Sequence, residues 1–178
     1  TLIDAPVARM RQAAIDGTLS IMVGGSDENF RMVEPFLGTM GTEITHCGDT
    51  GTGQVVKVLN NMVVFMTVNA LAEALAIGRS AGVDGALLFD VMSKGSADSF
   101  ALRTPGQKAL VPGKFPENTF PTTYAIKDIS LALELAQQGD IDAASATLTA
   151  NLLKRTAEAG YSQNYYPAMI NLIAAEAR

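Results

Sequence analysis

The chain has 178 residues, of which 48% are hydrophobic and 17% are charged, a composition typical of one globular domain or of one domain with part of another. Its net charge of -5 and the lack of any Lys or Arg run argue against a nucleic-acid-binding surface. A single cysteine, Cys47, beside a single histidine, His46, excludes an intramolecular disulfide, argues against a structural zinc site and is typical of a reducing, cytoplasmic location.

The first 47 residues alternate strand-like runs with helical ones. Strands are predicted at 2–3, 19–23 and 44–47, and helices at 9–16 and 27–37. Ser26 followed by two acids is typical of a helix N-cap and first turn, and Phe30, Val33 and 36–37 are expected on one face of that helix. The chain starts on Thr and directly on a strand-like run, so we expect a segment to precede it.

After Gly53 the pattern is helical throughout. Residues 54–81 form one unbroken, nearly all-apolar helical pattern capped by Gly82, which predicts a helix buried on several sides. Its most apolar stretch, 62–72, is shorter than the roughly 20 residues of a membrane span. Helices are also predicted at 84–93, 99–111 with a break at Pro105, 122–138, 142–159 and 167–178. The predicted fold class is therefore mainly α, with an all-helical domain around one long central helix, preceded by β/α elements.

A glycine-rich stretch, GDTGTGQVVKVLNN at 48–61, lies where the pattern changes. It has the glycine spacing of a P-loop, but Gln54 and Val55 stand where the phosphate-binding Lys and the Mg²⁺-binding Ser or Thr belong. It begins like the dinucleotide motif GxGxxG, but Val56 stands at the third glycine position. The template GxxGxGxxxKxxxN fits completely, through Gly48, Gly51, Gly53, Lys57 and Asn61.

Two other stretches accompany this motif. DAPV at 4–7 is followed by GTL at 17–19 and MVGG at 22–25, and Phe120 is followed by Lys127-Asp128. In this order the three stretches resemble the substrate-side, catalytic and cofactor-side motifs of the β-hydroxyacid dehydrogenase family, which includes 3-hydroxyisobutyrate dehydrogenases and tartronate semialdehyde reductases. The resemblance covers nearly the whole chain.

The resemblance implies that the chain is the C-terminal part of such an enzyme, without the GxGxxG half with which its members begin. Residues 1–50 would end the Rossmann-type nucleotide-binding domain, and residues 51–178 would form the all-α substrate and dimerisation domain. The implied reaction interconverts a small 3-hydroxy acid and its semialdehyde by hydride transfer with NAD or NADP. The isolated chain is expected to be inactive, because the part that holds the cofactor's adenosine and pyrophosphate would be missing.

Lys57 is the predicted general acid/base. Lys57 and Asn61 lie one helical turn apart on the same face, and a lysine in an apolar stripe is unusual unless it is paired or functional. Desolvation lowers the pKa of a lysine and lets it exchange a proton near neutral pH. From spacing alone, a lysine whose stem covers apolar surface remains an alternative. The resemblance favours Lys57 as acid/base on the substrate oxygen and Asn61 as a substrate ligand.

The glycines Gly48 and Gly51 are predicted to turn the strand into the helix and to bring backbone N–H groups near an anionic substrate. The resemblance assigns Phe120, Lys127 and Asp128 to the cofactor side.

One departure from the family follows DAPV. The family usually continues with Ser-Gly-Gly, which receives the substrate carboxylate, whereas this chain has Ala8-Arg9-Met10. Ala8 and Arg9 therefore stand at the expected carboxylate site, where Arg9 either binds a carboxylate through two N–H groups or points into water.

Other functions and partners stay open at this point. The chain could be a non-catalytic helical dimerisation fragment or a relative of imine reductases, although these usually replace the motif lysine. The long apolar helix needs more cover than the other helices offer, so a homodimer, or a homotetramer built from it, is expected. The tyrosines at 161, 165 and 166 suit either that interface or the core.

Overall fold

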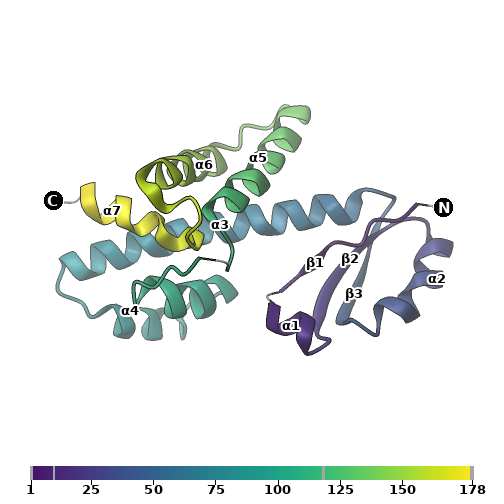
Figure 1. The fold of residues 1–178 in the computed structure, drawn as a ribbon, viewed down its shortest axis with the longest axis horizontal. Coiled ribbons are helices and arrows are strands. Elements are labelled where there is room, and N and C mark those ends of the chain that lie inside the picture. The colour runs from purple at the N-terminus through teal and green to yellow at the C-terminus, as the bar shows by residue number, and fades with distance from the viewer. Residues whose placement is uncertain (1, 10, 118, 177–178) are drawn as a thin grey trace. The chain divides into compact units, whose positions relative to one another are not determined.

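The structure, a computed structural model, describes residues 2–9, 11–117 and 119–176 (Figure 1). The chain divides into two units, Thr1–Asn60 and Asn61–Arg178. Among the described residues, the first unit holds the three strands and the second is built of helices. This confirms the predicted change from mixed β/α structure to helical structure along the chain.

The small sheet of the first unit has the strand order β1-β2-β3. Strand β1 (Val7–Ala8) pairs antiparallel with β2 (Leu19–Gly24), which pairs parallel with β3 (Gly41–Gly48). Helix α1 (Arg11–Ile15) joins the first pair, and α2 (Asp27–Leu37) makes the crossover that a parallel pair requires. The core of this unit consists of Ile21, Val23 and Leu37.

Two predictions about this unit were wrong. Residues 2–3 are not a strand. The pairing with β2 begins later, with a bridge from Asp4 to Gly24 and then with the short strand β1. Pro6, which has no N–H to donate, lies between these two pairings. Phe36 is 72% exposed. It lies off the face on which Phe30, Val33 and Leu37 recur at helical spacing.

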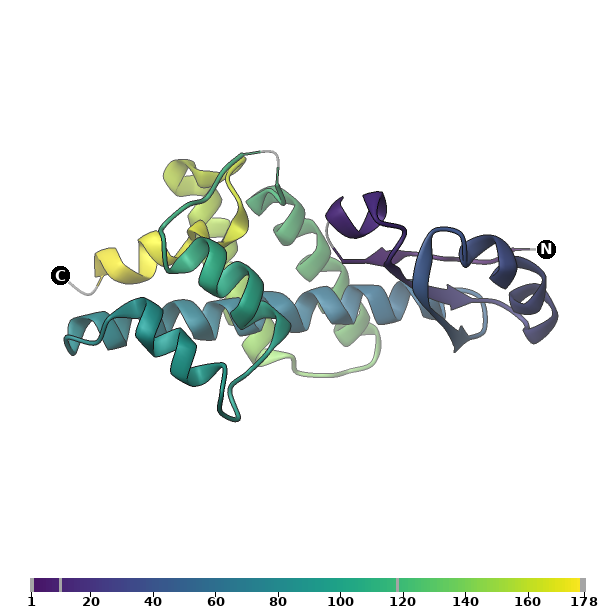
Figure 2. The same cartoon turned by 90° about the horizontal axis from the view of Figure 1, so that it is seen from below.

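Helix α3 (Thr52–Ser80) is 29 residues long and unbroken (Figures 1 and 2). Its C-terminus is capped as predicted by Gly82, whose φ is 82°, with the Val83 N–H bonded to the Gly78 carbonyl. By length and composition alone, α3 is long and apolar enough to cross a membrane. The shorter stretch 62–72 did not predict this. In the most apolar window of α3, 22% of the residues are buried. Val63 and Ile77 are 51% and 67% exposed. The expected burial on several sides is therefore not reached within one chain.

The helical unit packs its elements around one core. After α3 come α4 (Gly85–Met92), a π-helix (Leu102–Leu110), α5 (Thr122–Gln138), α6 (Ala144–Thr156), a π-helical turn (Ala157–Tyr161), a 3₁₀ turn (Tyr166–Met169) and α7 (Ile170–Glu176) (Figure 2). Fully buried side chains of this core include Val68, Leu75, Phe89, Ile129 and Leu153.

The predicted break at Pro105 does not occur. Pro105 lies inside the continuous helical run that starts at Phe100 and has π-helical turns over Leu102–Leu110, and these wider turns carry the helix past a residue that has no N–H to donate. The wide turn continues to the Val111 N–H, which bonds to the Gly106 carbonyl at 3.1 Å.

An aromatic cluster forms the part of the core near the C-terminus. The Tyr166 ring meets Phe65 and Phe120 edge-on, with centroids 5.0 and 5.9 Å apart, and also meets Tyr165. Tyr165 and Tyr166 are buried, so both belong to the core and not to an exposed surface. Burial raises the pKa of Tyr166 well above 10.0, and it raises the pKa of Tyr165 against the opposing effect of the hydrogen bond with Tyr166.

This burial predicts a loss of stability at alkaline pH. Above about pH 10 an exposed tyrosine of the unfolded chain ionises, whereas Tyr166, whose pKa is raised in the fold, stays neutral. The unfolded state then releases the proton first, and the free energy of unfolding falls as the pH rises. Urea midpoints measured from pH 7 upward are expected to fall less steeply above about pH 10 in Tyr166→Phe. Tyr124→Phe, at an exposed ring, is the control, and equal slopes in both variants would contradict the prediction.

Candidate active site

The junction between β3 and α3 is built of glycines that other residues could not replace. Gly48 and Gly51 have φ of 115° and 100°, a region that side chains rarely adopt. A Cβ on Gly53 would lie 2.4 Å from the Met22 carbonyl oxygen, and one on Gly24 would lie 2.8 Å from the Asp49 carbonyl oxygen. Strand β2 and the first turn of α3 therefore touch backbone to backbone.

The carboxylate of Asp4 closes this junction. Its Oδ1 accepts the Gly51 N–H at 2.5 Å, and its Oδ2 accepts the Gln54 N–H at 2.7 Å. Asp4 also exchanges two backbone hydrogen bonds with Gly24, at 2.8 and 3.0 Å. The anion at the start of α3 is therefore the protein's own carboxylate, and the prediction that the Gly51 N–H meets an anionic substrate stays a prediction.

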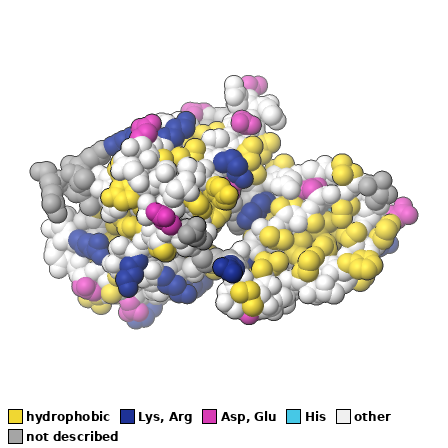
Figure 3. Space-filling model, in the orientation of Figure 1, with side chains coloured by type: hydrophobic (Ala, Val, Ile, Leu, Met, Phe, Trp, Pro, Cys, Tyr) yellow, Lys and Arg dark blue, Asp and Glu magenta, His cyan; other side chains and the backbone are white. Residues whose placement is uncertain are grey.

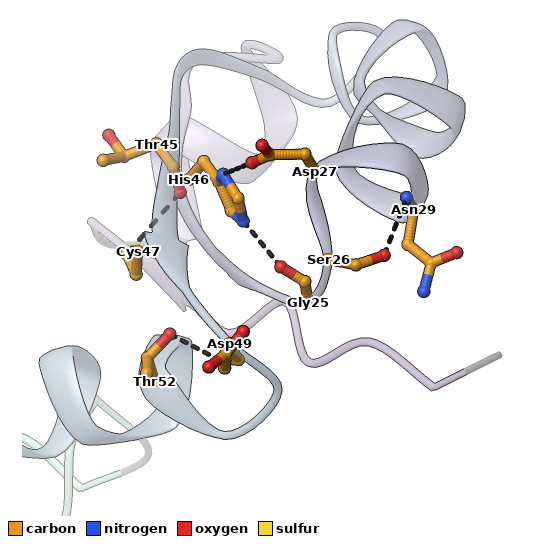
Figure 4. Close-up of polar contacts among 9 residues, drawn as sticks. All are labelled: Gly25, Ser26, Asp27, Asn29, Thr45, His46, Cys47, Asp49 and Thr52. Atoms are coloured by element: carbon orange, nitrogen blue, oxygen red, sulfur yellow. Dashed lines mark hydrogen bonds and ion pairs between the residues drawn. The ribbon is translucent and has the colours of Figure 1, made fainter.

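A second set of contacts holds the junction from α2 (Figure 4). His46 Nε2 lies 2.7 Å from the Gly25 carbonyl oxygen, and His46 Nδ1 lies 3.3 Å from Asp27 Oδ1. The imidazole stacks on Phe30 with centroids 4.7 Å apart. The hydroxyl of Thr52 donates to the Asp49 carbonyl at 2.7 Å. His46 and Thr52 thus bond to groups of the protein itself.

Ala8 and Arg9 follow the DAPV run. Ala8 is buried in β1 opposite Ser20. Arg9 has a φ of 79°, the left-handed region in which glycine is favoured, and glycine is what the family usually has here. The Arg9 guanidinium donates through Nη1 to the Thr18 carbonyl at 2.6 Å and to the Thr42 hydroxyl at 3.4 Å. Arg9 thus bonds to the protein itself, and a role with substrate stays a prediction.

The motif lysine and asparagine both lie in α3, four residues apart, and both are partly buried. The Asn61 Nδ2 group donates to Asp128 Oδ2 at 2.7 Å. The Lys127 ammonium lies 2.7 Å from the other oxygen, Asp128 Oδ1. Within the helical unit, one carboxylate therefore joins the predicted substrate ligand Asn61 to the predicted cofactor-side residue Lys127.

The exposures of the cofactor-side residues differ. The Asp128 side chain is 15% exposed and that of Lys127 is 66% exposed. Phe120 is partly buried against the helical core, beside Phe65 and Tyr166. The nearly buried carboxylate of Asp128 therefore holds an ammonium that is itself exposed.

Neither the contacts of Asp4 nor the bond between Asp128 and Asn61 was predicted from the sequence. The partners of Asp4 lie 47 and 50 residues away, and Asn61 is 67 residues from Asp128. Two features of the sequence bear on these contacts: an acid near a strand, and a helix preceded by a glycine, which has no side chain to cap it. Neither signal indicates which distant groups meet.

Two family models match the chain. One, described as "NAD-binding of NADP-dependent 3-hydroxyisobutyrate dehydrogenase", matches residues 51–173, and the other, described as "NAD binding domain of 6-phosphogluconate dehydrogenase", matches residues 1–48. These matches, with the complete GxxGxGxxxKxxxN motif at the start of α3, define the class as that of NAD-binding dehydrogenases. More particularly, the chain belongs to the β-hydroxyacid dehydrogenase family.

Individual relatives agree with this family. The chain is 38% identical to the 3-hydroxyisobutyrate dehydrogenase of Pseudomonas aeruginosa over 89% of its own length and 55% of that protein. It is 36% identical to the 2-(hydroxymethyl)glutarate dehydrogenase of Eubacterium barkeri over 78% of its length and 46% of that protein. The structure of Mycobacterium tuberculosis 3-hydroxyisobutyrate dehydrogenase with L-serine matches with a TM-score of 0.85 and 30% identity, covering 96% of this chain and 60% of that one. The chain spans about half the length of the curated relatives it matches.

The bond between Asn61 and Asp128 predicts a measurable stabilisation of the helical unit. Asp128→Ala removes the acceptor of this bond and the partner of Lys127, so the free energy of unfolding is expected to fall by about 1–3 kcal/mol. Urea denaturation measures the change. Glu134→Ala, at an exposed acid of the same helix, is the control and is expected to change stability by less than about 0.5 kcal/mol. Equal midpoints for the two variants would show that the Asn61–Asp128 bond contributes nothing.

Proposed function

We propose that the whole protein containing this chain is a dehydrogenase that interconverts a small 3-hydroxy acid and its semialdehyde with NAD or NADP. The observation that carries the proposal is the complete GxxGxGxxxKxxxN motif, which begins α3 at a glycine junction in a chain of this family. Relatives named as dehydrogenases of 3-hydroxyisobutyrate and of 2-(hydroxymethyl)glutarate, both hydroxy acids, support it.

In this proposal Lys57 takes the proton of the substrate hydroxyl during oxidation and returns it during reduction. Asn61 holds the same oxygen or the carboxylate, and its bond to Asp128 fixes its amide. A bound nicotinamide cofactor would supply the acceptor for the hydride of the carbinol carbon. The products are then the aldehyde, the reduced cofactor and a protonated Lys57.

Cofactor contacts are proposed for the residues of the cofactor-side motif. Lys127 would meet a negative group of the cofactor, since its ammonium is exposed and held by Asp128. Phe120 would pack at the edge of that site, where its ring extends from the aromatic cluster of the helical core. Asp128 acts on both the cofactor side and the substrate side, because it holds Lys127 with one oxygen and Asn61 with the other.

The first 50 residues are proposed to be the end of a Rossmann-type nucleotide-binding domain, and 51–178 the all-α domain arranged around α3. The match of residues 1–48 to a NAD-binding model supports this. So does the surface of the first unit, on which apolar side chains gather (Figure 3). Leu2, Ile15 and Phe36 are exposed there, and exposed apolar patches of this kind are usually covered by other protein surface.

The substrate is proposed to carry a carboxylate, with Ala8 and Arg9 nearest to it. The structure of the M. tuberculosis relative contains L-serine, which is a 3-hydroxy acid with a carboxylate. Arg9 has a backbone conformation that glycine favours, and because such a conformation costs free energy in a residue with a side chain, it motivates the proposal of a specific use for Arg9. The Gly48 and Gly51 backbone conformations serve this proposal by turning β3 into α3.

The central prediction concerns turnover by Lys57→Ala. If Lys57 is the general acid/base, kcat of the whole protein is expected to fall by about 10²- to 10⁴-fold, the usual contribution of such a group. Lys94→Ala is the control, because Lys94 forms an exposed ion pair with Asp90. A kcat for Lys57→Ala within about threefold of the parent would exclude Lys57 as the acid/base.

A homodimer, or a tetramer built from it, is proposed to cover α3. Within the helical unit, Val63, Ala70 and Ile77 are exposed at seven-residue spacing and so share one face of α3. On α4, Leu87 and Val91 are also exposed. Packing this apolar surface against a second copy would remove it from water.

The corresponding test is the oligomeric state in light scattering. The parent chain is expected to be a dimer or tetramer at micromolar concentration, and Val63→Glu/Ile77→Glu is expected to be a monomer, because two buried charges oppose association. Leu148→Glu, at an exposed apolar residue of α6, is the control. A monodisperse parent monomer would contradict the proposed assembly.

A further inference from the structure

We propose that Asp4 is a positioning residue for Lys57, through its bonds to the amides of Gly51 and Gln54, called here the Asp4 clamp. The inference rests on the proposed function of Lys57 and adds to it a residue that sets where the lysine stands. All four residues belong to the same unit of the chain, Thr1–Asn60.

The Asp4 clamp replaces a helix cap that α3 cannot supply for itself. The residue before the first helical position is Gly51, which has no side chain to accept the free N–H groups of the first turn. An N-cap side chain normally accepts from the second or third helical N–H, and Asp4 accepts from the third, Gln54, as well as from Gly51. The cap therefore comes from the substrate-side DAPV run.

The fit around the carboxylate leaves little freedom. A Cβ on Gly24 would lie 2.3 Å from Asp4 Oδ1, and a Cβ on Gly53 would lie 2.7 Å from Asp4 Oδ2. The Thr50 hydroxyl adds a hydrogen bond to the Leu2 carbonyl at 3.1 Å. The negative charge also lies at the positive end of the α3 dipole. Asp4 is thereby enclosed by backbone on the sheet side and on the helix side.

The clamp acts on Lys57 through the helix. Gln54 and Lys57 are three residues apart on α3 and therefore neighbours on its surface, and a helical side chain leans back over the preceding turn. Lys57 thus lies in the turn that directly follows the one held by Asp4. Because Asp4 begins the DAPV run, the same carboxylate fixes Lys57 relative to Ala8 and Arg9, the residues proposed to meet the substrate.

The test compares Asp4→Asn, Lys57→Ala and the double variant in the whole protein. Asn keeps the size of the side chain but presents an NH₂ group to one of the two N–H donors. Asp4→Asn is expected to lower kcat by about 10- to 100-fold, the effect of a misplaced catalytic group. In the Lys57→Ala background it is expected to cause no further loss, because residues that act as a unit are not additive. Asp4→Glu is the second variant: it keeps the charge but adds a methylene to a close-fitting site, so it is also expected to lower kcat.

Asp49→Asn is the matched control, since it removes a charge from the same loop but leaves the Asp49 carbonyl bond to Thr52. A kcat for Asp4→Asn within about threefold of the parent, or the same fold-loss with and without Lys57, would overturn the positioning role. Amide hydrogen exchange gives a readout that needs no activity: exchange at Gly51 and Gln54 is expected to speed up in Asp4→Asn, and unchanged exchange would refute the clamp. A Lys57→Ala variant with full kcat would instead refute the proposed function alone.

Discussion

The carboxylate of Asp4, bonded to the amides of Gly51 and Gln54, is the interaction on which the start of α3, and with it the proposed position of Lys57, depends. It joins the beginning of the chain to the beginning of α3 across almost 50 residues of sequence. Glycines at 24 and 53 allow the close approach, because a Cβ at either position would collide with Asp4 or with backbone. The glycine motif therefore serves to bring a strand and a helix together, and the position of Lys57 follows from where that helix begins.

A second carboxylate has the corresponding role in the helical unit. Asp128 is nearly buried and holds Asn61 from α3 with one oxygen and Lys127 from its own helix with the other. Such charge-assisted hydrogen bonds are stronger and more directional than neutral ones. Asp4 thus holds the start of α3, and Asp128 holds the amide of Asn61.

Much of the fold followed from periodicity and capping alone. The helices at 27–37 and 122–138 and the glycine end of α3 were predicted at or near their observed bounds, because local patterns determine them. The strand at 2–3, the break at Pro105 and the burial of Phe36 were predicted wrongly, because each depends on neighbours that spacing does not reveal. The motif residues follow from the resemblance to a family, whereas the contacts of Asp4 and Asp128 can be identified only in the folded structure. The Gly51 N–H illustrates the difference: the pattern indicated an anion there, and the structure supplies Asp4.

The most direct measurement of the proposed activity follows a single hydrogen. The whole protein would be incubated with NAD or NADP and 3-hydroxyisobutyrate carrying deuterium on its carbinol carbon, and the reduced cofactor would be analysed by mass spectrometry and NMR. The account predicts that deuterium appears on the nicotinamide ring and that the acid becomes its semialdehyde. Turnover that leaves the cofactor free of deuterium, or no turnover of this or any other small 3-hydroxy acid by protein that binds the cofactor, would contradict it.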